Sequence, residues 1–166
     1  MLKVHKNSNR IVNQKVVIRL TVLMLLFIGF YFFRIASIVG ESMEPTLLNG
    51  KRAIVLINRF NLYRPNRNDI VLVRKNTYDN KVLVKRVIGL PGDVLEIKDG
   101  ELYINSVLQS EPYIKEKMST TDLIVELGEG EIFIMGDNRN NSVDSRIPNI
   151  GVINVDEEVI GKLIFN

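Results

Sequence analysis

The sequence predicts one membrane-spanning helix near the N-terminus, followed by a compact, mostly β domain. Three observations lead to this fold class. Residues 16–38 form the longest apolar run of the chain. After residue 50 the chain is a series of short β-branched runs separated by turn signals. Nothing after residue 39 sustains the 3.6-residue apolar period of a helix, so one all-β domain is expected over residues 39–166.

The apolar run of residues 16–38 reads VVIRLTVLMLLFIGFYFFRIASI. As a helix it extends about 34 Å, enough to cross a bilayer core with some tilt. Arg19 and Arg34 lie near its ends, where their stems can snorkel, and the aromatic residues 31–33 suit a membrane interface. The uninterrupted part, residues 20–33, is short enough that a cleaved signal sequence and a buried core helix remain alternatives to an anchor.

Charge predicts the orientation of this anchor. Residues 1–40 carry six Lys and Arg and no acid, whereas all 19 acids follow. The positive-inside rule therefore places residues 1–15 in the cytoplasm, residues 16–38 in the membrane and residues 39–166 outside the cell membrane. Because the outer part is slightly acidic, a nucleic-acid partner is not expected, whereas membrane lipid is.

The outer domain contains eight runs typical of strands. Asp99-Gly100, between two of these runs, predicts a tight hairpin. The chain has no cysteine, so an apolar core must hold the domain without disulfides. The expected strands lie at 53–57, 69–73, 81–88, 93–97, 101–104, 122–127, 131–135 and 159–165.

Several familiar chemistries are excluded by composition. The single histidine, His5, lies on the other side of the membrane from the outer serines, which excludes a Ser-His-Asp triad if the span is real. Clustered His or Cys ligands for zinc do not occur in the sequence. Residues 137–148 have the outline of a calcium loop, but Arg139 and Pro148 stand where oxygen ligands are needed. We expect no metal and no cofactor.

A lysine can act as a general base if burial lowers its pKa, since only the neutral amine accepts a proton. Strand alternation in KVLVKRVI places Lys85 on one face with Leu83 and Val87, an apolar setting that depresses an amine's pKa. The alternative is an edge-strand lysine that reaches solvent.

For two further segments the sequence leaves both a structural and a functional interpretation open. Ser42, in GESMEPTLLNG, lies a few residues beyond the apolar run, and it is either a nucleophile or the N-cap of a short helix. The segment GDNRNNS, residues 136–142, is either a polar surface loop or a loop that orients a lysine, because its side chains form dense local hydrogen bonds.

Taken together, four segments resemble the boxes of the bacterial type I signal peptidases, in that family's order and after an N-terminal anchor. They are SMEPT (42–46), RNDIVLV (67–73), KRVIGLPGD (85–93) and GDNRNNSVDSR (136–146). The short interval between the last two boxes resembles the compact, single-span members. The resemblance implies a Ser-Lys serine endopeptidase that removes signal peptides from exported precursors, with the signal peptides as its partners.

Residue roles follow from this resemblance alone. Ser42 looks like the nucleophile and Lys85 like the general base. Ser142 resembles the hydroxyl that hydrogen-bonds the lysine amine, and Asp144 and Arg146 look like the pair that braces Ser142.

The resemblance also implies a pocket for an Ala-x-Ala-like site. Short or apolar side chains occupy the matching positions, which suits selection of alanine by excluding larger groups. One departure is Gly40, which stands where many members carry a hydroxyl that helps the oxyanion hole, so only the Ser42 backbone N–H is assured as a donor. The pocket positions are Ile38, Met43, Leu47, Leu83 and Val84.

Two other functions remain open. Ser-Lys self-cleaving proteases of the repressor-processing type share this β architecture, although the anchor argues against them. A membrane-anchored β domain that binds a partner without catalysis is the other alternative, and the presence of both Ser42 and Lys85 argues against it.

Overall fold

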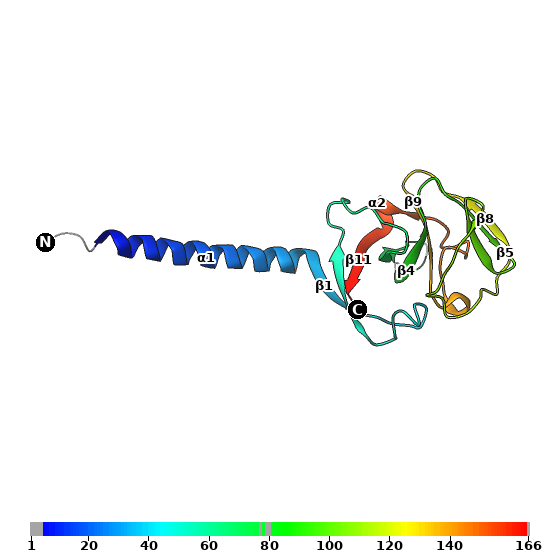
Figure 1. Cartoon of the computed structure of the whole chain (residues 1–166), viewed down its shortest axis with the longest axis horizontal. Helices are drawn as coiled ribbons and strands as arrows, with labels where there is room; N and C mark the ends of the chain where they lie inside the picture. The colour runs from blue at the N-terminus through cyan, green and yellow to red at the C-terminus, as the bar shows by residue number, and fades with distance from the viewer. Residues whose placement is uncertain (1–4, 77, 79–80, 166) are drawn as a thin grey trace. The chain divides into compact units, whose positions relative to one another are not determined.

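The computed structural model describes residues 5–76, 78 and 81–165 (Figure 1). The chain divides into two units, Met1–Phe33 and Arg34–Asn166. The first unit contains helix α1 (His5–Phe32), and the second is built of strands. A mostly β domain after one N-terminal apolar helix is the fold class that the sequence predicts, and the structure confirms it.

Helix α1 is the one helix in the described part of the chain that is long and apolar enough to cross a membrane, over Asn13–Phe32. Its end differs from the prediction for residues 16–38, because the chain leaves the helix after Phe32. Residues Phe33–Ser37 form strand β1 instead. The reason is pairing: β1 lies beside strand β2 (Arg52–Ile57), and just beyond it Ile38 N–H donates to the Lys51 carbonyl at 2.8 Å.

The larger sheet of the domain has the order β1-β2-β11-β3-β4-β9-β10. All eight predicted strands are present within a residue or so of their predicted ends, and β1, β7 and β10 are additional. The remaining strands of this sheet are β3 (Ile70–Arg74), β4 (Val82–Gly89), β9 (Glu131–Met135), β10 (Ile153–Asn154) and β11 (Val159–Phe165).

The smaller sheet has the order β7-β6-β5-β8. The Asp99-Gly100 hairpin is confirmed: Lys98 pairs with Glu101, and both turn residues have positive φ, 50° and 74°. A 3₁₀ turn, η1 (Arg139–Asn141), and a single-turn helix, α2 (Val155–Glu158), were not predicted. The strands are β5 (Val94–Lys98), β6 (Glu101–Ile104), β7 (Val107–Leu108) and β8 (Leu123–Glu126).

Strand β4 lies inside the larger sheet, between β3 and β9, and its side chains enter three apolar clusters. Val87 belongs to the cluster built on β3 and β9, Ile88 to the cluster shared with the smaller sheet, and Val84 packs against the cluster beneath Ser42. Lys85 is therefore not on an edge strand, and only 3% of its surface is exposed. The solvent-reaching alternative for Lys85 is wrong.

Candidate active site

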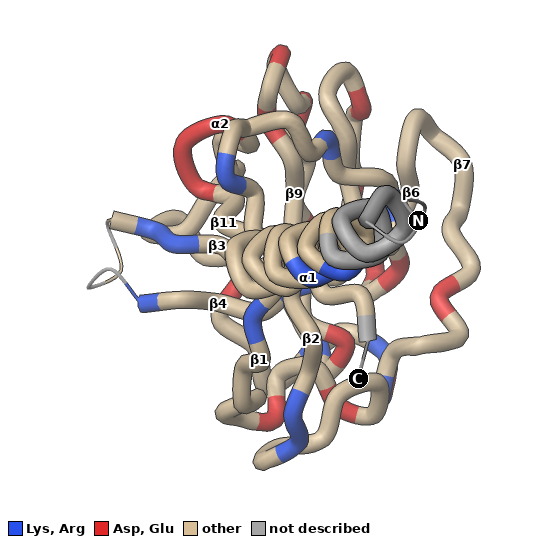
Figure 2. Tube along the Cα trace, turned by 90° about the vertical axis from the view of Figure 1, so that its left-hand side faces the viewer, with Lys and Arg blue, Asp and Glu red and all other residues tan. Residues whose placement is uncertain are grey.

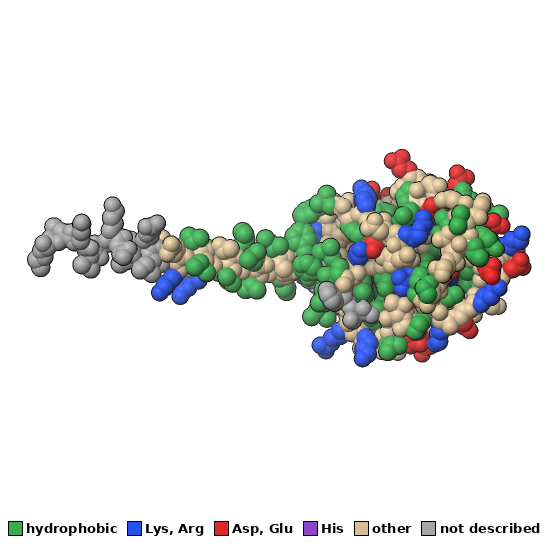
Figure 3. Space-filling view, viewed as in Figure 1, with side chains coloured by type: hydrophobic (Ala, Val, Ile, Leu, Met, Phe, Trp, Pro, Cys, Tyr) green, Lys and Arg blue, Asp and Glu red, His purple; other side chains and the backbone are tan. Residues whose placement is uncertain are grey.

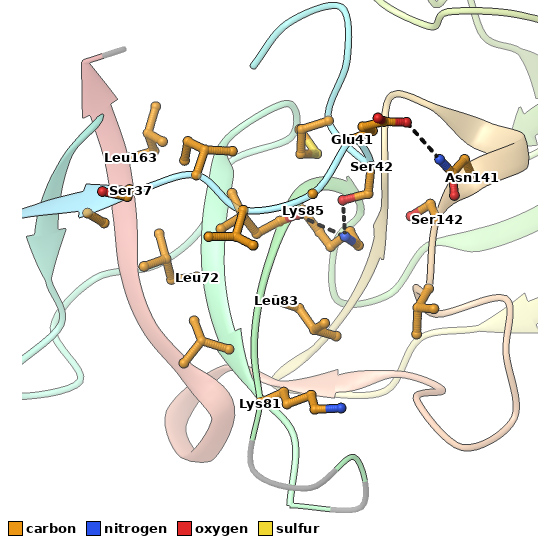
Figure 4. Close-up of a pocket in the computed structure, with 18 of the residues that line it drawn as sticks. Ser37, Glu41, Ser42, Leu72, Lys81, Leu83, Lys85, Asn141, Ser142 and Leu163 are labelled. Atoms are coloured by element: carbon orange, nitrogen blue, oxygen red, sulfur yellow. Dashed lines mark hydrogen bonds between the residues drawn. The ribbon is translucent and has the colours of Figure 1, made fainter. Parts of the chain in front are cut away.

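Ser42 and Lys85 meet in the structure although 43 residues separate them along the chain. Lys85 Nζ lies 2.7 Å from Ser42 Oγ and 3.1 Å from the Val84 carbonyl oxygen, to which it donates (Figure 4). Ser42 begins no helix, since residues 42–46 form turns. The N-cap alternative for Ser42 is thus wrong, and its hydroxyl instead bonds the lysine amine.

The environment of Lys85 lowers the pKa of its amine to about 8. Burial is the main cause, because removing water penalises the ammonium form more than the neutral amine. The carboxylates of Asp144 and Asp137 oppose this shift, and the Arg146 guanidinium adds to it. At pH 7 a group with a pKa of about 8 is neutral in roughly one molecule in ten, against about one in several thousand for an ordinary lysine.

The backbone around Ser42 is held by the segment that follows β9. Asn138 N–H donates to the Ser42 carbonyl at 3.0 Å, and the Asn138 side chain donates to the Glu41 carbonyl at 3.1 Å. Gly136 approaches so closely that a Cβ built there would lie 2.4 Å from the Ser42 carbonyl oxygen. Only glycine permits this contact between the two segments.

The hydrogen bond predicted for Ser142 is absent from the structure. Its Oγ is buried and has no hydrogen-bond partner among the described residues, so the expected bond to the Lys85 amine is not made in this structure. Ser142 Oγ also lies against Gly136, 2.3 Å from where a Cβ of that residue would be. Figure 4 shows the Ser142 hydroxyl on the side that faces the Ser42 and Lys85 pair.

Asp144 and Arg146 form the predicted ion pair, with Arg146 Nε 2.8 Å from Asp144 Oδ1. Their bonds reach other groups than Ser142. Asp144 Oδ2 accepts the Gly136 N–H at 3.0 Å, and Arg146 Nη2 donates to the Arg139 carbonyl at 2.6 Å. The pair therefore braces the backbone just before the 3₁₀ turn and at its first residue, rather than the Ser142 hydroxyl.

A cleft of about 800 Å³ opens beside Ser42 and Lys85. Four of the five predicted pocket residues line it: Ile38, Met43, Leu83 and Val84. Leu47 does not line it. Its side chain is buried in the cluster beneath the cleft, together with Ile38 and Met43, and so supports the wall from behind.

Gly40 also lines the cleft, with φ at +96°. Its N–H donates to Asn49 Oδ1 at 3.1 Å, and a Cβ at this position would meet nothing within 4 Å. Space is therefore not the obstacle to a side chain here. The obstacle is the positive φ of Gly40, because residues other than glycine are strained at such a φ.

Comparison with known proteins agrees with this geometry. The family model described as "Signal peptidase, peptidase S26" matches residues 11–166. The chain belongs to this family. It is therefore a peptidase, and helix α1 is consistent with the membrane association of the family.

Individual relatives extend over most of the chain. A signal peptidase I of Bacillus licheniformis is 37% identical over 140 residues, covering 76% of this chain and 73% of the relative. Signal peptidase I T of Bacillus subtilis is 33% identical over 173 residues, covering 96% and 88%. The crystal structure of a signal peptidase I from Enterococcus faecalis is 32% identical with a TM-score of 0.53, and it covers 61% of this chain and 98% of that one.

Sequence reasoning missed a second buried ion pair behind the site of this S26 peptidase. Arg86, next to Lys85 but on the opposite face of β4, contacts Asp137 through Nε at 2.8 Å and Nη2 at 2.6 Å. Thr46 donates to the same carboxylate, and the Tyr113 ring lies 4.0 Å from the Arg86 guanidinium carbon. The sequence shows Arg86 next to Lys85 and Asp137 next to Gly136, but no local pattern indicates that these two opposite charges form a pair.

A third ion pair anchors the 3₁₀ turn from outside the four boxes. Arg139, 1% exposed, donates to both carboxylate oxygens of Glu111 at 2.6 and 2.7 Å, and its Nε donates to the Gly136 carbonyl at 3.0 Å. Glu111 also accepts from the Tyr113 hydroxyl at 2.9 Å. The connection after β7 thus reaches the active-site loop, a contact that no short motif reveals.

Proposed function

We propose that the chain is a membrane-anchored serine endopeptidase that removes signal peptides from exported precursor proteins. In this proposal it cleaves after an Ala-x-Ala-like site, with Ser42 as nucleophile and Lys85 as general base. The observation that carries the proposal is the 2.7 Å contact between Lys85 Nζ and Ser42 Oγ, at the floor of an apolar cleft in an S26-family chain.

The proposed reaction uses the lysine twice. The neutral Lys85 amine takes the Ser42 hydroxyl proton as Oγ attacks the scissile carbonyl carbon. The resulting ammonium then gives that proton to the departing amine, which leaves an ester between Ser42 and the signal peptide. A water molecule, activated by the same amine, hydrolyses the ester. The Ser42 N–H is the expected donor to the oxyanion in both tetrahedral intermediates.

The cleft supports selection of small side chains next to the cut bond. Ile38, Met43, Leu83 and Val84 line it with methyl and methylene groups. Ile38 and Met43 are buried and packed from behind by Leu47, so the wall cannot recede to admit a larger side chain without disrupting that cluster. Exclusion by such a wall favours alanine.

The proposed topology keeps residues 1–15 in the cytoplasm and residues 39–166 outside. Ser42 is the tenth residue after the end of α1, so the chain between them can span at most about 36 Å. A precursor that emerges from the membrane brings its cleavage site to the same surface. Protease added to wall-stripped cells tests the orientation: a tag at residue 166 is digested and one at residue 2 survives, and the reverse pattern would refute it.

Cleavage of a purified precursor tests the activity. Detergent-solubilised full-length chain is mixed with a precursor that carries an Ala-x-Ala site, and the new N-terminus is sequenced. We expect cleavage by the wild type and none by Ser42→Ala or Lys85→Ala. Lys98→Ala, an exposed lysine of the smaller sheet, is the matched control and keeps full activity. Cleavage of the chain's own backbone in place of the precursor would favour the self-cleaving alternative.

A further inference from the structure

The proposed mechanism relies on one backbone donor for the oxyanion, the Ser42 N–H, and this donor has to point into the cleft. The cationic side chains that line the cleft are Lys81 and Lys85. Lys85 acts as the base, and Figure 4 shows Lys81 away from Ser42, beyond Leu83. Figure 2 shows Lys and Arg positions spread over the strands of the domain rather than gathered at one point. The direction of the Ser42 N–H therefore decides how well the oxyanion is held.

Peptide geometry links this N–H to the Glu41 carbonyl. Both groups belong to the planar, trans peptide unit between Glu41 and Ser42, so they point in opposite directions. A bond that holds the Glu41 carbonyl thus sets the direction of the Ser42 N–H. In the described part of the chain no hydrogen bond uses the Ser42 N–H as its donor, which leaves this group available to an oxyanion.

Asn138 holds the Glu41 carbonyl from a distant part of the chain. Its Nδ2 donates to this carbonyl at 3.1 Å, and only 3% of the residue is exposed. The Glu44 N–H also donates to the Glu41 carbonyl at 3.1 Å, but Glu44 belongs to the same turn as Ser42 and moves with it. The Asn138 side chain is therefore the tie between this peptide unit and the rest of the domain.

The local structure around Asn138 gives its side chain a different ordinary role. Asn138 is the N-cap residue of the 3₁₀ turn η1, and an asparagine at the start of a helix commonly accepts a bond from the first N–H groups. The Asn138 side chain makes no such capping bond. It is directed to Glu41 instead, so stabilisation of the turn does not explain it.

The two neighbours of Asn138 in the chain hold it in place. Asp137 is paired with Arg86, and Arg139 is paired with Glu111. Each of these four side chains is less than a tenth exposed. Because Asn138 lies between the two pairs, the ion pairs that sequence reasoning missed act on the site through it.

Other bonds fix the backbone before and after the Glu41–Ser42 peptide unit. Asn138 N–H donates to the Ser42 carbonyl at 3.0 Å, and Gly40 N–H donates to Asn49 Oδ1 at 3.1 Å. Neither bond involves the Asn138 side chain. Replacing that side chain thus leaves both bonds possible, and its effect on activity reports on the one peptide unit between them.

We infer that Asn138 is a positioning residue of the reaction, whose side-chain amide aims the Ser42 N–H at the oxyanion. This inference rests on the proposed function, in which Ser42 attacks a carbonyl carbon. Without the amide, the peptide unit can turn and the bond to the oxyanion weakens. The Lys85 amine and the apolar wall of the cleft stay as they are.

Asn138→Leu tests this role, because leucine is close to asparagine in shape and cannot donate. On a precursor peptide we expect kcat to fall about 10- to 100-fold, with KM changed by about twofold at most. The pH limb of kcat/KM should stay near 8, since other groups set the pKa of Lys85. The full-length chain is kept in detergent, because α1 exposes hydrophobic side chains along its length (Figure 3).

A transition-state analogue gives a readout that a purely structural role would not change. The Ser42 hydroxyl adds to a peptide aldehyde ending in Ala-x-Ala: the Oγ–C bond forms, the C=O bond becomes a C–O bond, and its oxygen lies where the oxyanion would. The matching peptide alcohol has no carbonyl and binds through the cleft alone. We expect Asn138→Leu to weaken aldehyde binding by the same factor as kcat/KM and to leave alcohol binding unchanged.

Asn58→Leu is the matched control. Asn58 Nδ2 donates to the Val159 carbonyl at 3.3 Å, so this variant loses the same kind of bond at a residue that does not line the cleft. It should keep the wild-type kcat below its Tm. Asn138→Ala repeats the test with a smaller side chain, and it decides by the same criteria if Asn138→Leu does not fold.

Two results would overturn the role of Asn138. One is a variant within about threefold of the wild-type kcat, too small an effect for a displaced oxyanion donor. The other is an equal loss of aldehyde and alcohol binding, since the variant would then act on the cleft as a whole. A wild type that neither cuts the precursor nor binds the aldehyde would instead refute the proposed function.

Discussion

Replacing Gly136 by alanine places a methyl group between the backbone at Ser42 and the segment of residues 136–146. Its Cβ would lie 2.3 Å from Ser142 Oγ and 2.4 Å from the Ser42 carbonyl oxygen, and ordinary contact begins at 3.4 Å. The Ser42 backbone, the Ser142 side chain or both must therefore move by about 1 Å. Gly136 cannot itself withdraw, because its N–H is bonded to Asp144 and its carbonyl to Arg139.

A displacement of about 1 Å at a reacting group costs roughly 100-fold in rate. We therefore expect Gly136→Ala to lower kcat about 100-fold on a precursor peptide, with a smaller change in KM because the atoms nearest the added methyl belong to Ser42 and Ser142 and not to the apolar side chains of the cleft. Crowding a packed site also costs about 1–3 kcal/mol of stability, so a second variant is needed to separate the two effects.

Gly89→Ala supplies that control. Its Cβ would lie 2.5 Å from Leu95 Cδ1 and 2.6 Å from Leu127 Cδ1, so it crowds side-chain methyl groups in the core between the sheets and no backbone atom of Ser42. Both variants should have a lower Tm by calorimetry, and only Gly136→Ala should lose kcat below that temperature. A Gly136→Ala enzyme within about threefold of the wild-type kcat would refute the claim that this glycine sets the position of Ser42.

Four further outcomes are expected. Because the Lys85 pKa is lowered to about 8 and only the neutral amine is a base, kcat/KM should rise with pH along a limb near 8, and Lys85→Arg should be inactive; a limb near 10 would contradict this. Ser142→Ala should not lower Tm, since the buried Ser142 hydroxyl has no partner among the described residues. It should still lower kcat roughly tenfold or more, because we expect the hydroxyl to turn to the Lys85 amine when substrate covers it, and an unchanged kcat would remove Ser142 from the mechanism. Glu111→Gln leaves the buried Arg139 charge uncompensated and should cost about 3–5 kcal/mol of unfolding free energy in denaturant titrations, whereas Glu101→Gln, in an exposed pair, should cost at most about 1. Gly40→Ser should lower kcat rather than restore an oxyanion donor, because φ is +96°, and a gain in kcat would show that the backbone relaxes.

The parts of the fold that sequence predicted well are those set by local chemistry. Alternation in KVLVKRVI placed Lys85 on the face with Leu83 and Val87, and the Asp99-Gly100 turn fixed the β5–β6 hairpin. Both depend on residues within a few positions of each other. The end of α1 was predicted six residues late, because FRIAS is apolar enough to continue a span and only its pairing with β2 makes it a strand.

Contacts between distant segments could not be predicted in the same way. The Arg86–Asp137 and Arg139–Glu111 pairs join residues 51 and 28 positions apart, and many other charged residues were equally available as partners. Resemblance to a family assigned Ser142 to the lysine amine, but its orientation depends on the space left by Gly136. Local sequence patterns thus located the site, whereas the packing of residues 136–146 determines which side chains bond one another there.

The pairing of β4 with its neighbouring strands also determines which of two cationic side chains, Lys85 or Arg86, faces Ser42. Val71 pairs with Lys85 on one side and Met135 pairs with Arg86 on the other, so adjacent residues present an amine to Ser42 and a guanidinium to Asp137. A strand that slipped by one residue would exchange the two faces. The nucleophile would then face a guanidinium, which stays protonated at any physiological pH. A one-residue insertion or deletion at the start of β4 is thus a change of chemistry as well as of length, and this strand should tolerate substitutions at its apolar positions far better than any change in length.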